Sequence, residues 1–183
     1  MIADVALTGA AIAIAYVIIS DRGRTADVGE APSGKPTYQK DWETAHQAGI
    51  EVGDANGELR LVEFVDLECP ACAYFHLEVL PGIRQKLPGL SHRIVHFPLP
   101  SHRQAVPAAH AAECARLQGR FPQFVDTTLS AQRELGVVSW GNLARRAGVR
   151  DSASFARCME APTPRSIERS GFAFSDSETA CAM

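Results

Sequence analysis

The sequence predicts an α/β fold in which a strand–helix–strand unit precedes a block of four helices. Two short runs rich in β-branched and aromatic residues, at 60–66 and 91–99, are separated by one helical segment. From residue 105 to residue 162 the apolar positions recur at helical spacing. The chain has 183 residues, which at roughly 100 to 200 residues per domain allows one such domain and an appendage.

Composition and charge are those of an ordinary globular domain. Hydrophobic residues make up 46% of the chain and charged residues 21%, which excludes disordered, collagen-like and coiled-coil architectures. Eighteen Lys and Arg against 21 Asp and Glu give a formal net charge of −3. Because no dense basic run is present to neutralise phosphates, nucleic acid is not an expected partner.

The N-terminal segment, residues 1–21, is apolar from Val5 to Ile19 and is followed by Arg22 and Arg24. As a helix, the apolar run would span about 22 Å, short for a hydrocarbon core of ~30 Å but sufficient with flanking residues. We expect an uncleaved helical membrane anchor, with a cleaved signal segment or a buried helix as alternatives. Lys and Arg lie only on its C-terminal side, and the positive-inside rule would therefore leave the rest of the chain in the cytoplasm.

The globular domain is predicted to span residues 42–183, after a polar linker at 22–41 that contains several Gly and Pro. A helix should open near Cys69 and end at Leu80, before Pro81. This crossover between the two strands predicts that they are parallel and that the connection is right-handed.

The helical block follows the second strand. Its first helix is Ala-rich and stops at Gly119, and Ser139 and Asp151 are the expected N-caps of the third and fourth. Three aromatic residues of the block are expected in its core: Phe121, Phe124 and Trp140.

The strongest functional signal is the motif Cys69-Pro70-Ala71-Cys72, placed where the first strand meets the helix. Two cysteines three residues apart in a first helical turn have Cα atoms within disulfide reach. The unpaired N–H groups and the helix dipole stabilise a thiolate at Cys69, which we expect to lower its pKa from ~8.5. Cys69 is therefore the predicted nucleophile, and Cys72, one turn deeper and less exposed, the resolving thiol. Pro70 removes one amide donor beside the thiols and so affects their redox potential.

A pair of cysteines at this spacing also occurs in metal sites. A structural zinc site needs four ligands, and no second Cys pair or His pair of suitable spacing completes one, since His92 and His96 merely share a strand face. We therefore predict neither a metal nor a cofactor. Two alternatives remain for the motif. The chain could be a copper metallochaperone that binds the ion with Cys69, Cys72 and a histidine, or the two cysteines could be inert buried thiols.

The run LVEFVDLECPACAYF resembles the active-site strand and helix of the thioredoxin superfamily. FPLPSHRQAVPAAHAAECA followed by FARCME is similar to the DsbA-like branch, in which a helical subdomain is inserted after the second strand, here at about residues 102–162. The resemblance implies a thiol–disulfide oxidoreductase that acts on thiols and disulfides of proteins and is recycled by a redox partner. We expect it to be membrane-anchored and to work outside the cytoplasm, although the charges after the apolar segment favour the opposite orientation.

Glu63, six residues before Cys69, also fits this pattern. A carboxylate within an apolar strand is costly to bury when charged, so we expect a raised pKa. The resemblance implies that it exchanges a proton with the resolving thiol; the alternative is a side chain that points out of an edge strand. We expect His76 to be solvated, and His102 to be a loop or capping residue or a group near the thiols.

Cys114 and Cys158 each lie on the apolar face of a predicted helix. Free buried cysteine is the commoner state for such positions, and a disulfide between them is the alternative.

The resemblance predicts a cis-proline loop, two further strands and a last helix after the helical block. Thr163-Pro164 is followed by polar residues, which indicates entry into a helix instead. Roughly 40 to 50 residues of this pattern are missing or replaced, taking typical lengths for two strands and a helix. We therefore expect incomplete C-terminal strands, and activity that is impaired or, in an inactive remnant, lost.

Overall fold

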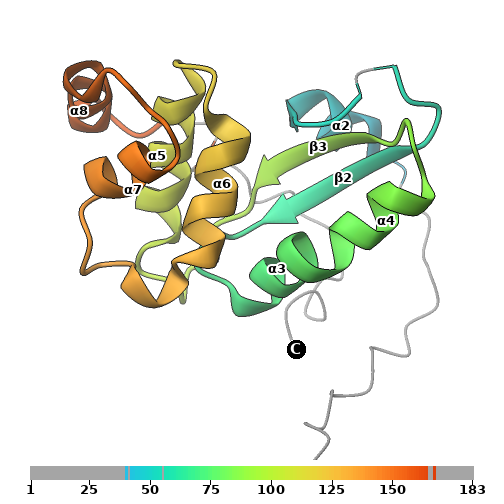
Figure 1. Ribbon diagram of the computed structural model, residues 1–183, viewed down its shortest axis with the longest axis horizontal. Helices are drawn as coiled ribbons and strands as arrows, with labels where there is room; N and C mark the ends of the chain where they lie inside the picture. Colours follow the sequence, from blue (N-terminus) through green and yellow to red (C-terminus); the bar gives the residue numbers. More distant parts are fainter. Residues whose placement is uncertain (1–39, 41, 55, 165–166, 168–183) are drawn as a thin grey trace, which may run out of the picture. The chain divides into compact units, whose positions relative to one another are not determined.

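The computed structural model describes residues 40, 42–54, 56–164 and 167 (Figure 1). The predicted anchor at 1–21, nearly all of the linker and the predicted incomplete C-terminus lie outside the described residues. None of the described helices is long and apolar enough to cross a membrane.

A small mixed sheet carries the thiol motif. Its strands are β1 (Ile50–Glu51), β2 (Arg60–Val65) and β3 (Ser91–His96). Their order is β1-β3-β2, with β1 antiparallel to β3 and β2 parallel to it, so that Glu63 lies opposite Ile94. The parallel pair confirms the predicted strand–helix–strand unit. The two-residue β1, and the helix α2 (Trp42–Ala48) before it, were not predicted.

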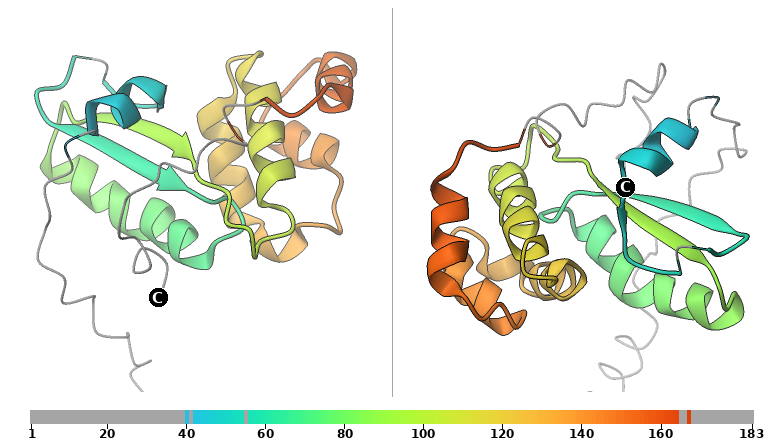
Figure 2. Two further views of the ribbon diagram at one scale, coloured as in Figure 1. Left: turned by 180° about the vertical axis from the view of Figure 1, so that it is seen from behind. Right: turned by 90° about the horizontal axis from the view of Figure 1, so that it is seen from above.

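The connection between β2 and β3 is one long helix with a π-turn in its middle. Its parts are α3 (Pro70–Tyr74), the π-helical turn η1 (Phe75–Val79) and α4 (Leu80–Lys86). Pro81 has no N–H to donate to a carbonyl of the preceding turn. In the wider π-turn the Leu80 N–H donates to the Phe75 carbonyl, and this turn accommodates Pro81 within the helix. The predicted end at Leu80 is therefore wrong, and the helix continues to Lys86. Figure 2 shows this helix on one side of the sheet and α2 on the other.

The helical block confirms the four predicted helices and stands at the carboxyl ends of β2 and β3 (Figure 1). Its elements are α5 (Ala105–Arg116), α6 (Phe121–Ser130), the 3-10 turn η2 (Gln132–Glu134), α7 (Trp140–Arg146) and α8 (Ser152–Glu160). Ser139 accepts from the Asn142 N–H and Asp151 from the Ser154 N–H, which confirms both predicted caps.

One hydrophobic core joins the helical block to the sheet. Phe124 is fully buried, and its ring centroid lies 6.2 Å from that of Phe155. The same core includes Val65 and Ile94 from the sheet, and Trp140 packs against it. The elements on either side of the thiol motif are therefore held by shared packing.

Cys114 and Cys158 form a disulfide between α5 and α8, with their Cα atoms 5.7 Å apart. The expectation of two free thiols is wrong, because α5 and α8 pack against each other and bring the two side chains together. No cis peptide bond occurs among the described residues. After α8, the Ile167 N–H donates to the Pro164 carbonyl at 2.9 Å. This contact agrees with the predicted helix entry after Thr163-Pro164.

Candidate active site

Cys69 and Cys72 are both free thiols at the start of the long helix. Cys69 is the N-cap residue of α3 in an extended conformation, and Pro70 occupies the first helical position, where its missing N–H costs no hydrogen bond. Cys69 is only 8% exposed, whereas Cys72 is half-buried. The expected order of exposure is therefore reversed.

Gln132, on the η2 turn of the helical block, bonds to the backbone beside Cys69. Its side-chain Nε2 donates to the carbonyl of Leu67 at 3.1 Å and to that of Cys69 at 2.9 Å. These bonds hold the turn after α6 against the thiol motif. Gln132 is more than sixty positions from Cys69 in the chain, and no local pattern marks it.

Burial raises the pKa of the Cys72 thiol to about 12, and the negative charges of Cys69 and Asp66 act in the same direction. A backbone hydrogen bond from Asp66 opposes them but is outweighed. Cys72 is therefore protonated at neutral pH and must lose its proton before it can attack a disulfide.

Asp66 is a buried carboxylate that sequence reasoning missed. It accepts hydrogen bonds from the Glu68 N–H at 2.8 Å, the Leu99 N–H at 2.7 Å and His102 Nδ1 at 2.8 Å. It thus joins the loop before the thiols to the loop after β3, and His102 lies in that second loop. The only signal in the sequence is its position, an acid at the end of the strand just before the motif.

Glu63 is buried and its carboxylate is ionised. Its Oε2 atom accepts from His76 Nδ1 at 2.9 Å and from His92 Nε2 at 2.9 Å. Burial raises the pKa, but the hydrogen bonds from the two histidines together outweigh it and lower the pKa below its usual value. The expectation of a raised pKa is wrong for this reason. The alternative of an outward-pointing side chain is also wrong, although β2 lies at an edge of the described sheet.

His76, expected to be solvated, is buried between two carboxylates. Its Nε2 atom lies 3.0 Å from Asp126 Oδ1 on α6, and its Nδ1 atom contacts Glu63. Burial lowers the pKa, but the bonds to Asp126 and Glu63 outweigh it and raise the pKa to about 9, so the ring is an imidazolium. His76 follows Cys72 by one helical turn and shares its inward face, which is why it is not solvated.

The network continues from Glu63 through His92 and returns to the long helix at Arg84. Arg84 Nη2 donates to His92 Nδ1 at 2.6 Å. A guanidinium only donates, so His92 Nδ1 accepts this bond, while the other ring nitrogen, Nε2, contacts Glu63. A continuous chain of polar contacts thus joins four elements and reaches the surface at Asp126, whose side chain is 60% exposed. Its members are Arg84, His92, Glu63, His76 and Asp126.

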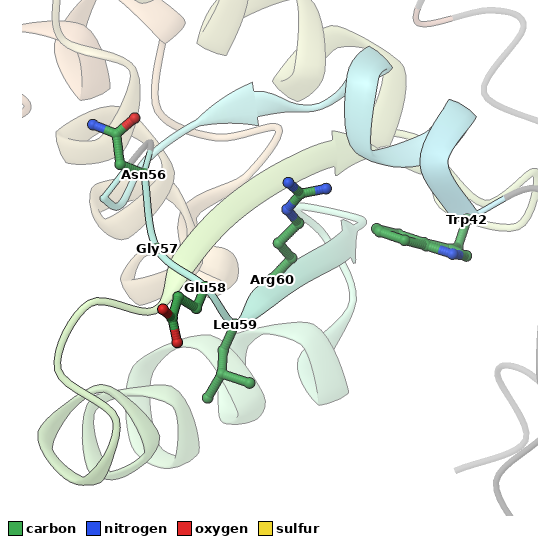
Figure 3. Close-up of a pocket in the computed structure, with 6 residues that line it drawn as sticks. All are labelled: Trp42, Asn56, Gly57, Glu58, Leu59 and Arg60. Carbon is green, nitrogen blue, oxygen red and sulfur yellow. The ribbon is translucent and has the colours of Figure 1, made fainter.

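A cavity of about 670 Å³ lies elsewhere on the domain (Figure 3). It is lined by Trp42, Arg60 and the loop at 56–59, and the Arg60 guanidinium carbon lies 6.0 Å from the Trp42 ring centroid. The cavity is at the first residue of β2, whereas the thiols follow the last, so it is separate from the thiol motif. In the described part of the chain, no third ligand atom joins Cys69 and Cys72 in a group that could hold a metal ion.

Comparison with known proteins agrees with this geometry. The family model for Thioredoxin matches residues 45–169. A thioredoxin-like oxidoreductase from Silicibacter pomeroyi DSS-3 is 25% identical, with a TM-score of 0.56 over 72% of this chain and 75% of that chain. BdbD from Bacillus subtilis is 18% identical, with a TM-score of 0.58 over 76% of this chain and 77% of that one. ScsC from Proteus mirabilis is 18% identical, with a TM-score of 0.51 over 85% of this chain and 73% of that chain.

No curated protein matches the sequence. The family match covers most of the domain, and the solved structures have a similar fold over about three quarters of this chain. The chain belongs to the thioredoxin family.

Proposed function

We propose that this chain is a thiol–disulfide oxidoreductase that exchanges disulfides with protein substrates through Cys69 and Cys72. The observation that carries the proposal is the pair of free thiols at the start of α3, directly after a buried strand, in a chain of the thioredoxin family. The Silicibacter protein is described as a thioredoxin-like oxidoreductase, which favours the same general chemistry here.

The exchange reaction needs only the two thiols and the substrate disulfide. The Cys69 thiolate attacks one sulfur of a substrate disulfide, which forms a mixed disulfide and releases the other substrate sulfur as a thiolate that takes up a proton. Cys72 then loses its proton and attacks Cys69 Sγ, which forms the Cys69–Cys72 disulfide and releases the reduced substrate. Two electrons pass to the substrate. In reverse the same steps oxidise a dithiol, and a dithiol or disulfide partner recycles the pair.

The roles follow from the positions of the thiols. Cys69, at the N-cap, lies where the positive end of the helix dipole stabilises a thiolate. Cys72, with its pKa near 12, is the thiol that stays protonated until the second step. Glu63 is ionised and is therefore in the form that accepts a proton. Its carboxylate contacts His76, which lies on the same face of the helix as Cys72. We assign Glu63 to proton transfer during the second step.

Single-cysteine variants test the assignment. Cys69→Ser should abolish insulin reduction, whereas Cys72→Ser should accumulate a mixed disulfide with the substrate, detected on non-reducing gels. Glu78→Gln, an exposed change on η1, is the matched control and should retain activity. Normal turnover by Cys69→Ser would refute the roles, and an inactive parent chain with both thiols intact would mark an inactive remnant.

Glu63→Gln tests the proton transfer separately. We expect the rate at which Cys72 resolves the mixed disulfide to fall at least tenfold. The pH dependence of this rate should also lose the group that titrates below pH 4.5. The rate of attack by Cys69 should not change. Equal slowing of both steps would show that Glu63 acts only through the stability of the fold.

We further propose that the protein is anchored in a membrane and works outside the cytoplasm. The Cys114–Cys158 disulfide supports this location, because disulfides persist in oxidising compartments. Protease digestion of intact and lysed spheroplasts measures the topology. Digestion of the domain only after lysis would place it in the cytoplasm and overturn the proposal.

A further inference from the structure

The Cys114–Cys158 pair has a third potential metal ligand beside it. On α5, His110 precedes Cys114 by one helical turn, and α8 brings Cys158 against the same face. A ring nitrogen of His110 and the two Sγ atoms all lie within 4.8 Å of one another. This cluster is built entirely within the helical block and contains neither thiol of the Cys69–Cys72 motif.

His110 is the third member of the cluster, and only 6% of the residue is exposed. None of the described residues makes a hydrogen bond or an ion pair with its side chain. A ring nitrogen of His110 lies within 4.8 Å of both sulfur atoms and is therefore available to bind a cation beside them.

We propose that reduction of the Cys114–Cys158 disulfide creates a site for a thiophilic d¹⁰ cation, held by His110, Cys114 and Cys158. Two thiolates and one imidazole are a ligand set that such cations bind in proteins. Donor atoms bonded to one Zn²⁺ at about 2.0 to 2.3 Å lie about 3.5 Å apart, so small rotations of these side chains complete the site.

The chemistry balances with a dithiol as the reductant. The dithiol supplies two electrons and two protons, becomes a disulfide, and leaves Cys114 and Cys158 as two thiols. Binding of the cation then releases both thiol protons, while His110 binds in its neutral form and the cation does not change its oxidation state.

Zn²⁺ fits this site better than Cu⁺. Cys114 is fully buried, and two thiolates with Zn²⁺ make a neutral site, whereas Cu⁺ leaves one net negative charge in the same surroundings. Cys158 is half-buried and provides the side from which the ion and a fourth, water ligand can enter. The cation would replace the disulfide as the link between α5 and α8.

The test uses the full chain carrying Cys69→Ser, Cys72→Ser and Cys181→Ser, so that only the second pair remains. After reduction with a phosphine, which is not a thiol ligand, Zn²⁺ and Cu⁺ are titrated separately in competition with chromophoric chelators. We expect one Zn²⁺ per chain, release of about two protons per ion below the pKa of the thiols, and no binding by the oxidised protein. Tight Cu⁺ binding without Zn²⁺ would support the site and assign it to Cu⁺.

His110→Ala should weaken binding at least tenfold, and His46→Ala, a half-buried histidine on α2, is the matched control that should not. Should reduction loosen the fold, added Zn²⁺ should raise the melting temperature of the reduced chain but not of the His110→Ala chain. Failure of both cations to bind, or equal binding after His110→Ala, would overturn the proposal. Because Cys69 and Cys72 are absent, neither result bears on the proposed exchange reaction.

Discussion

His76 Nδ1 lies 2.9 Å from Glu63 Oε2, and both side chains are buried although thirteen positions separate them in the chain. The contact fastens the π-turn of the active-site helix to the middle of β2. The other ring nitrogen of His76 reaches Asp126, so the same imidazolium also holds α6 of the helical block. One side chain therefore links the thiol-bearing helix, the sheet and the inserted helices.

Replacing His76 should destabilise the domain strongly. His76→Leu leaves the Glu63 carboxylate buried with one of its two histidine partners, and breaking a buried pair in this way costs about 3 kcal/mol. Urea denaturation measures the loss as a lower midpoint. Glu78→Ala, an exposed substitution on the same turn, should change the free energy of unfolding by less than about 0.5 kcal/mol. Equal midpoints for both variants would show that the buried pair contributes nothing.

The stability of the domain should fall as the pH rises from 6.5 to 9. His76 has a folded-state pKa of about 9 against an ordinary value of 6.5, so in this window the folded chain holds a proton that the unfolded chain has lost. The contribution is fully present below pH 6.5 and disappears above pH 9, a change of about 3 kcal/mol. Chemical denaturation at a series of pH values measures it, and the decline should be absent from His76→Gln. The same slope in both proteins would exclude His76 as its source.

Glu63 contributes in the opposite direction at low pH. Its folded-state pKa is lowered, so its contribution to the free energy of unfolding is present above its unfolded pKa of 4.5 and is lost as the pH falls further. Glu63→Gln should therefore be less sensitive to acid than the parent between pH 4.5 and pH 3, measured by the urea midpoint. Unchanged acid sensitivity would show that the carboxylate is already protonated there.

Asp66→Asn should make Cys72 easier to deprotonate. Burial is the largest cause of the high pKa of Cys72, and the negative charge of Asp66 adds to it, so removing that charge lowers the pKa modestly. The N–H groups of Glu68 and Leu99 bond to different oxygens of Asp66, so Asn keeps one of these bonds and loses the other. The rate of Cys72 alkylation against pH, in the Cys69→Ser background, measures the effect. Glu68→Gln is the control, and slower alkylation after Asp66→Asn would contradict the expected sign.

Removal of the second disulfide should lower stability without touching the first thiol pair. Cys114 and Cys158 are 44 positions apart, and the chain-entropy relation gives about 4 kcal/mol for a loop of this length. The double variant Cys114→Ala/Cys158→Ala should therefore lose up to that amount by urea denaturation. Reaction of Cys69 with a small disulfide such as oxidised glutathione should keep its rate, since the helix start is unchanged. An unaltered midpoint would show that packing alone holds α5 to α8.

The sequence by itself determined the elements that depend on local properties. Apolar runs located β2 and β3, and helical periodicity with capping residues located the four inserted helices, because these signals act between residues close in the chain. The position of Cys69 and Cys72 at the start of a helix is also local. The helix α2, the two-residue β1 and the continuation of the thiol-bearing helix past Pro81 were not predicted, the last because a π-turn has no clear signature in a single sequence.

The tertiary structure decided everything that depends on which distant side chains meet. Glu63 is ionised because His76 and His92 reach it, and His76 is charged because Asp126 comes from α6. The helical block is bonded to the backbone of the thiol motif because Gln132 reaches the Cys69 carbonyl, and Cys114 meets Cys158 because α5 packs against α8. A pKa, an exposure or a disulfide is set by the surroundings of a side chain in space, and those surroundings exist only once the chain has folded.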